Sequence, residues 1–234
     1  MSRTTPDSGR PLPRERARRI ASAFHPGTLF GSRHHYVYAR AKLGSDPLYP
    51  GVCQALAGTS APVLDLGCGL GLLAHALHDA GLGLRYFGVD NDTGKIASAR
   101  RAAGRAGLAD AGFETLDLAA ALPPHRGSVA ILDLLQYLPP QRQPEVVSGA
   151  LDVLVPGARL VLRTGLEDGS RRGRMTRFGD VLARLAGWNN ALPTRYPEEA
   201  WLRALFEARG LEARFTPLSG NTPFNNWLVV ASRR

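Results

Sequence analysis

The chain has 234 residues, an apolar fraction of 44% and a formal net charge of +9. This length allows one domain with a buried core. Its apolar runs are shorter than the roughly 18 residues of a membrane helix. Two cysteines are too few for a disulfide framework, and we expect no secretory signal and a cytoplasmic location. Much of the charge lies in residues 1–19, which hold six arginines against one aspartate and one glutamate. The rest of the chain is unremarkable in charge, which argues against a nucleic-acid partner.

The first sixty residues predict a tail and a helical lid. Residues 1–13 are rich in proline, serine, threonine and arginine, which is typical of a disordered tail. Residues 14–24 predict a short basic helix. Residues 31–43 combine aromatic rings, histidines and cations, and Asp46-Pro47 then begins another helix with the aspartate as its N-cap. We treat residues 14–60 as a lid on the domain that follows.

From residue 62 onward, strands and helices alternate, which predicts a parallel sheet with helices on both faces. The expected strands are residues 62–66, 84–89, 112–116, 128–132 and 158–163, and the expected helices are residues 70–80, 93–106 and 139–154.

The last third of the chain changes character. Residues 170–187 predict an amphipathic helix whose arginines form a solvated basic face or, alternatively, contact an acidic partner such as an acyl carrier protein. A helix over residues 197–209 is followed by strands at 211–217 and 227–231. The short link between these strands favours an antiparallel pair. Residues 61–234 thus form one predicted domain.

A glycine-rich turn follows the first strand of this domain. Residues 63–71 read VLDLGCGLG, so strand, turn and helix follow one another as in nucleotide-binding βαβ units. Gly71 lies two positions after Gly69, whereas the third glycine of a dinucleotide site lies three positions after the second. Asp65 would also repel a diphosphate, and it suits a ligand that carries an amino group or a positive charge.

Residues 63–71 resemble the first motif of the class I methyltransferases that use S-adenosylmethionine (SAM). Asp90, Asp117 and Asp133 follow the second, third and fourth strands, where that family binds the ribose, the adenine and the methyl-transfer edge. Residues 151–162 resemble the family's helix, Pro-Gly turn and fifth strand. The resemblance implies a Rossmann-like α/β fold: a seven-stranded, mostly parallel sheet with an antiparallel C-terminal hairpin and helices on both faces.

The resemblance also implies a cofactor site for SAM. Its expected residues are Asp65, Gly67, Cys68, Gly69, Gly71, Asp90, Asn91, Asp117, Leu118, Asp133 and Arg40. Each aspartate has a simpler alternative role. Asp90 could cap the next helix in competition with Asn91 and Asp92, Asp117 could be a solvated turn residue, and Asp133 could cap a loop. Together, however, carboxylates at the ends of several parallel strands favour a ligand site.

The residues after the fourth strand bear on the methyl acceptor. Residues 133–140 read DLLQYLPP and lack the Asn/Asp-Pro-Pro-aromatic run of enzymes that methylate base amines. This segment, together with residues 35–43, 46–50 and 222–226, resembles methyltransferases of aryl-polyene and pigment gene clusters. The resemblance implies a small aromatic, phenolic acceptor or its precursor on an acyl carrier protein, and no metal.

Several side chains are candidates for the acceptor site. His35 or His34 could take a phenolic proton, and Tyr137 lies near the expected ligand edge. Tyr36 and Tyr38 could close over the ligands, while Arg40 could meet the SAM carboxylate. The alternative is that these lid residues only pack the N-terminal helix on the sheet. The remaining candidates for substrate contact are Arg163 and Asn226, although Asn226 could simply build the hairpin.

Other functions remain open on the sequence alone. The arginine-rich N-terminus would suit an RNA methyltransferase, and the fold could serve a non-catalytic scaffold. A nicotinamide oxidoreductase is disfavoured by Asp65. The sequence does not determine the acceptor atom, the general base or the oligomeric state.

Overall fold

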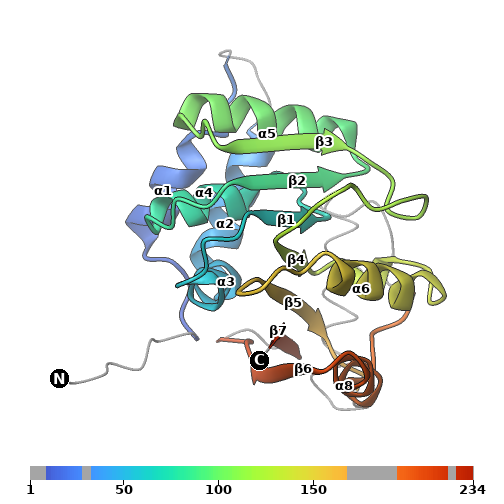
Figure 1. Ribbon diagram of the computed structural model, residues 1–234. Helices are drawn as coiled ribbons and strands as arrows, with labels where there is room; N and C mark the ends of the chain where they lie inside the picture. The colour runs from blue at the N-terminus through green and yellow to red at the C-terminus, as the bar shows by residue number, and fades with distance from the viewer. Residues whose placement is uncertain (1–8, 28–32, 168–193, 221–224, 234) are drawn as a thin grey trace.

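The structure is a computed structural model that describes residues 9–27, 33–167, 194–220 and 225–233. Within these ranges, seven strands form one sheet in the order β3-β2-β1-β4-β5-β7-β6 (Figure 1). The strands β1 to β5 run parallel, whereas β7 lies antiparallel between β5 and β6. Their bounds are Val63–Leu66 (β1), Tyr86–Asp90 (β2), Ala111–Thr115 (β3), Ser128–Leu132 (β4), Arg159–Gly165 (β5), Leu211–Pro217 (β6) and Asn226–Arg233 (β7).

Helices cover both faces of the sheet. One apolar cluster joins the sheet to α1 (Arg14–Ser22), α2 (His34–Ser45), α3 (Leu48–Leu56), α4 (Leu72–Asp79) and α5 (Thr93–Ala106). The other cluster joins it to α6 (Arg142–Asp152) and α8 (Glu199–Ala208). In β1, Val63 belongs to the first cluster and Leu64 to the second, as expected when alternate side chains of a strand point to opposite faces. The predicted α/β architecture, including its antiparallel hairpin, is confirmed.

The element bounds mostly agree with the sequence prediction, and β4, β6 and α5 agree fully. The helix expected from Pro139 begins only at Arg142, because a 3-10 turn, η1 (Leu135–Tyr137), comes first and the amide of Arg142 closes a turn on the carbonyl of Pro139. The helix predicted over residues 170–187 lies outside the described residues.

The N-terminal segments pack directly on the sheet domain. Leu12, which the prediction placed in the tail, is buried, and its amide donates to the carbonyl of Leu43 in α2. Residues 34–45 are helical, so the aromatic and cationic stretch presents distinct faces to the sheet and to solvent. None of the described helices is long and apolar enough to cross a bilayer.

Candidate active site

The glycine turn begins where β1 ends. Gly67, Gly69 and Gly71 all have positive φ, a conformation that favours glycine. A Cβ atom on Gly71 would lie 2.3 Å from the ring of Phe113, so this position also has no room for a side chain. The amides of Gly67 and Cys68 both donate to the carbonyl of Val89. These contacts fix the turn against the end of β2.

Asp65 is buried at the base of this turn. Its side chain accepts a hydrogen bond of 2.6 Å from the hydroxyl of Tyr86 through Oδ2. Its Oδ1 atom is buried and has no partner among the residues that the structure describes. Burial raises the pKa of Asp65 to about 7, although the Tyr86 hydrogen bond opposes the shift. An unpartnered buried oxygen of this kind is suited to a donor group from a ligand.

Asp90 is the last residue of β2, the strand next to β1, and lines the same cavity as Asp65. Its Oδ2 accepts from the amide of Gly69 at 2.8 Å, and its Oδ1 accepts from the amide of Asp92 at 2.9 Å. Asp92, and not Asp90, caps α5, because its Oδ1 accepts from the amide of Lys95. The capping alternative for Asp90 is therefore wrong.

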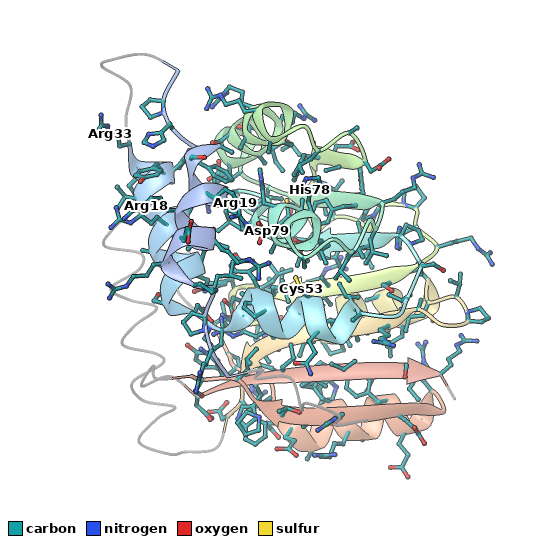
Figure 2. All side chains as sticks on the ribbon, turned by 90° about the vertical axis from the view of Figure 1, so that its left-hand side faces the viewer. Arg18, Arg19, Arg33, Cys53, His78 and Asp79 are labelled. Carbon is teal, nitrogen blue, oxygen red and sulfur yellow. The ribbon has the colours of Figure 1, made fainter. Side chains whose placement is uncertain are left out.

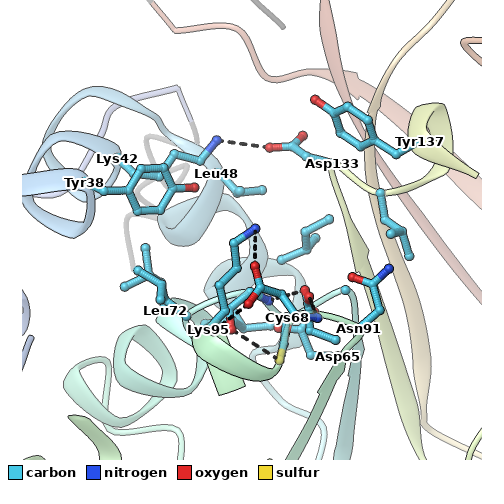
Figure 3. A pocket seen from close by; sticks show the side chains of 18 of the residues that line it. Tyr38, Lys42, Leu48, Asp65, Cys68, Leu72, Asn91, Lys95, Asp133 and Tyr137 are labelled. Carbon is cyan, nitrogen blue, oxygen red and sulfur yellow. Dashed lines mark hydrogen bonds and ion pairs between the residues drawn. The ribbon is translucent and has the colours of Figure 1, made fainter. Parts of the chain in front are cut away.

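The glycine turn, α2 and the loop after β4 enclose a cavity of about 420 Å³. Figure 3 shows Tyr38, Lys42, Asp133 and Tyr137 on one side of it, and Asp65, Cys68 and Asn91 on the other. The full lining is His34, His35, Tyr38, Lys42, Leu48, Tyr49, Asp65, Gly67, Cys68, Gly69, Leu70, Leu72, Leu73, Asp90, Asn91, Asp92, Gly94, Lys95, Leu132, Asp133, Leu134, Tyr137 and Leu138.

Two acids and two cations form a cluster at the upper side of this cavity, which we call the roof cluster: Lys42, Asp46, Asp133 and Arg163. The ammonium of Lys42 lies 2.7 Å from Asp46 Oδ2 and 3.0 Å from Asp133 Oδ2. Arg163 pairs with Asp133 through Nη1 and with Asp46 through Nη2. Burial disfavours the charge on Lys42, but Asp133 and Asp46 outweigh it and raise the pKa of Lys42 above its ordinary value. The cluster joins α2 and the residues before α3 to the ends of β4 and β5.

His35 and Tyr137, the two predicted catalytic residues, both line the cavity but belong to different parts of it. His35 contacts Ser98 of α5, with 2.9 Å between Nδ1 and Oγ. Burial and the neighbouring charge of His34 lower the pKa of His35. Tyr137 ends η1, on the side of Asp133 (Figure 3).

Two lid residues predicted to reach the ligands do not line the cavity. Arg40 is exposed, and Tyr36 stacks on His25 with ring centroids 3.9 Å apart. The helical repeat explains this, because Tyr38 and Lys42 lie one turn apart on the cavity face of α2. Positions two residues away point elsewhere, so for Tyr36 the packing alternative describes its contacts.

Five further predicted residues also lie outside the cavity lining, and Gly71 of the glycine turn is one of them. Asp117 is exposed, and its Oδ1 accepts from the amide of Ala119, as in a solvated turn. Leu118 is buried in the apolar cluster of α6 and α8. The remaining two are buried polar residues: Arg163 belongs to the roof cluster, and the carbonyl of Asn226 accepts from the amide of Leu218 in the hairpin.

Sequence reasoning missed two cavity residues of one kind. Lys42 and Lys95 are the two lysines of the chain, and both line the cavity. All other basic side chains of the chain are arginine or histidine. Lys95 lies 3.8 Å from Asp92 at the start of α5. The rarity of lysine was the available signal. Within the described residues, no cluster of histidine, cysteine, aspartate or glutamate could hold a metal ion.

Comparisons with known proteins agree with this architecture. Residues 63–157 match the family described as a methyltransferase domain. The magnesium protoporphyrin IX methyltransferase ChlM from Synechocystis PCC 6803, solved with bound SAH, is 22% identical over 94% of each chain, with a TM-score of 0.61. An O-methyltransferase family protein from Burkholderia thailandensis is 20% identical, with a TM-score of 0.65.

A third solved structure is the O-methyltransferase NcsB1 from neocarzinostatin biosynthesis, in complex with SAH and 1,4-dihydroxy-2-naphthoic acid; it is 18% identical, with a TM-score of 0.61. The present chain aligns over 86% and 87% of its length with the Burkholderia protein and NcsB1, but spans only 59% and 57% of theirs. No curated protein matches the chain by sequence. Residues 63–157 thus match a methyltransferase domain, and the fold of the described residues is that of methyltransferases solved with SAM or SAH bound.

Proposed function

We propose that this protein transfers the methyl group of SAM to a small aromatic acceptor, either free or bound to a carrier. The observation that supports the proposal is the cavity itself, which is lined by Asp65, whose Oδ1 has no partner among the described residues, and by Asp90, which accepts from the amide of Gly69. The aryl-polyene or pigment setting is the more specific form of the proposal, and it rests on the sequence resemblance alone.

The lower half of the cavity fits SAM. Asp65 has a buried acceptor for an ammonium group, and Asp90 ends β2 where two ligand hydroxyls could be bound side by side. The glycine turn lets a ligand approach the backbone closely. When bound, SAM supplies an electrophilic methyl group, so the protein has to align the acceptor, exclude water and accept a proton.

The upper half of the cavity suits an aromatic acceptor. Tyr38 and Tyr137 offer flat apolar surfaces, and Leu138 lies beside them in the lining. The complex of NcsB1 with 1,4-dihydroxy-2-naphthoic acid supports a hydroxylated ring as the acceptor class.

Calorimetry with S-adenosylhomocysteine (SAH) tests the cofactor half of the proposal. We expect the wild-type protein to bind SAH and Asp90→Ala to bind it about tenfold more weakly or worse, because a hydrogen bond to a charged group contributes about 1.5–3 kcal/mol. Asp152→Ala is the control, since Asp152 is exposed on α6 and pairs with Arg209. A wild-type protein that does not bind SAH would refute the proposal.

The RNA methyltransferase alternative gains no support from the N-terminal helix. Arg16 and Arg19 of α1 both pair with Asp79 of α4, so part of the basic segment holds two helices together. Figure 2 shows Arg19 beside Asp79. These two arginines are thus already engaged within the protein.

A further inference from the structure

The two carboxylate oxygens of Asp133 have different surroundings. Lys42 and Arg163 both contact Oδ2, which leaves Oδ1 without a partner among the described residues. The side chain lines the cavity and is 27% exposed. Two cations therefore hold one oxygen and fix the direction of the other.

The backbone holds Asp133 in this position. Asp133 has a φ of 55°, the only positive φ of a non-glycine residue in the described chain. Its amide donates to the carbonyl of Arg163 at 2.8 Å, which ties the first residue after β4 to β5. Such conformations persist where the surrounding structure enforces them, and they occur often at functional sites.

One hydrogen-bond donor of Lys42 has no acceptor among the described residues. An ammonium group carries three N–H bonds, and the carboxylates of Asp46 and Asp133 accept two of them. The side chain of Lys42 is 23% exposed and lines the cavity. The chain has only one other lysine and uses arginine elsewhere. A compact ammonium at this position directs its N–H bonds differently from a planar guanidinium.

We propose that Lys42 and Asp133 form the acceptor subsite and that this subsite binds the neutral hydroxyl group of an aromatic ring. The inference rests on the proposed function and assigns its acceptor atom. A hydroxyl group can accept from the Lys42 ammonium and donate to Asp133 Oδ1 at the same time. A carboxylate acceptor has no proton to donate and is repelled by Asp133. Tyr38 and Tyr137 flank this pair and would contact the ring.

The subsite provides a route for the proton during methyl transfer. As the acceptor oxygen forms its bond to the methyl carbon, the bond from that carbon to sulfur breaks and the sulfonium becomes a neutral thioether. The hydroxyl proton passes to Asp133 Oδ1 and from there to water. Lys42 stays protonated and stabilises the negative charge that develops on the oxygen.

The first test is turnover of phenols of graded acidity by Asp133→Asn. Asparagine tolerates a positive φ and keeps an oxygen for the two cations. We expect kcat/KM to fall about 10²–10⁴-fold, the usual contribution of a general base, and to fall least for phenols that are already ionised. Asp79→Asn is the matched control, because Asp79 also binds two cations but lies outside the cavity lining. An unchanged rate, or a deficit independent of phenol acidity, would overturn the inference.

The second test measures binding without turnover. 4-Nitrophenol is titrated into the SAH-bound protein below and above the pKa of the phenol. Wild type should prefer the neutral phenol, and Asp133→Asn should bind the ionised form at least tenfold more tightly than wild type does, because the repulsion is gone. Lys42→Met should weaken binding of both forms, while Lys42→Arg, which keeps the charge of the cluster, checks that the fold is intact.

Wild type that binds neither form of 4-nitrophenol, or an ionised form that binds equally well with and without Asp133, contradicts the subsite. SAH binding is measured separately in each variant. Its loss in wild type would refute the proposed function, whereas its retention with failed phenol binding would refute only the acceptor subsite.

Discussion

Asp79 and Asp133 are each held by two cations, but they face different surroundings. At Asp79, Arg19 contacts Oδ1 and Arg16 contacts Oδ2, so both oxygens are used to join α1 to α4 (Figure 2). At Asp133, both cations contact Oδ2, and the side chain lines the cavity. The side chain of Arg19 is 61% exposed, whereas that of Arg163 is 3% exposed. A carboxylate held by two cations thus joins two helices in one place and, in the proposed acceptor subsite, orients a reactive group in the other.

The largest effect on stability is expected from Arg163→Met. Removal of this cation leaves the buried Asp46 and the partly buried Asp133 with Lys42 as their one remaining cation in the cluster. We expect the free energy of unfolding, measured with urea, to fall by about 3–5 kcal/mol, the usual cost of breaking a buried ion pair. Arg209→Met, at an exposed pair, should cost less than about 1 kcal/mol. Equal costs at the two arginines would contradict the contrast.

Asp65 sharpens the contrast because it is a buried carboxylate that pairs with no cation in the described ranges. Burial raises its pKa from 3.8 to about 7. The folded state therefore holds the proton more tightly than the unfolded state does. This contribution to stability is complete below about pH 4 and is lost as the pH rises through about 7.

Asp65→Asn should remove this loss. Between pH 4 and pH 8, the free energy of unfolding of wild type should therefore fall by roughly 2–4 kcal/mol more than that of Asp65→Asn. The amide oxygen of asparagine can still accept from Tyr86. The measurement is urea unfolding across this pH range, with Asp79→Asn as the variant that keeps the wild-type slope. Parallel pH profiles for wild type and Asp65→Asn would show that Asp65 ionises normally.

The smallest effect is expected from Asp79→Asn. Partial burial opposes ionisation of Asp79, but hydrogen bonds from Arg19 and Arg16 more than offset it and hold the pKa of Asp79 below its usual value. Its stabilisation is thus present at neutral pH and is lost as the pH falls through that lowered pKa. At neutral pH we expect a loss of about 0.5–1 kcal/mol that shrinks in high salt. A loss of unfolding free energy above about 2 kcal/mol, or a loss that does not change with salt, would contradict this small electrostatic contribution of Asp79.

The fold and the lower half of the cavity could be predicted because they follow from local patterns. Alternating strand and helix periodicities predict the parallel sheet, and the carboxyl ends of parallel strands meet at one edge. From the sequence alone, this geometry predicts that Asp65, Asp90 and Asp133 lie near one another, and all three line the cavity. The same argument predicted Asp117 at this edge, because it follows the third strand. Its side chain accepts a hydrogen bond from the amide of Ala119 and does not line the cavity. The sequence alone does not decide between such a local hydrogen bond and a ligand contact.

The upper half of the cavity was harder to predict because its contacts are distant in sequence. Arg163 and Asp46 are 117 positions apart, and no local pattern pairs them. On α2 the prediction and the structure differ in helical phase: within residues 31–43 the sequence prediction named Arg40 as a ligand contact, whereas Lys42 lines the cavity. The spacing of four residues from Tyr38 to Lys42 to Asp46 would have indicated the face that meets the sheet.

The position of β7 between β5 and β6 has a consequence for biosynthesis. β6 pairs with β7 and not with the parallel strands, so its backbone has no sheet partner until residues 226–233 have left the ribosome. Until then β5 is also an open edge, which can pair with other chains. A nascent chain stalled before residue 226 would therefore expose two unpaired strands at once, and such stalled chains should depend on chaperones more than the finished protein does.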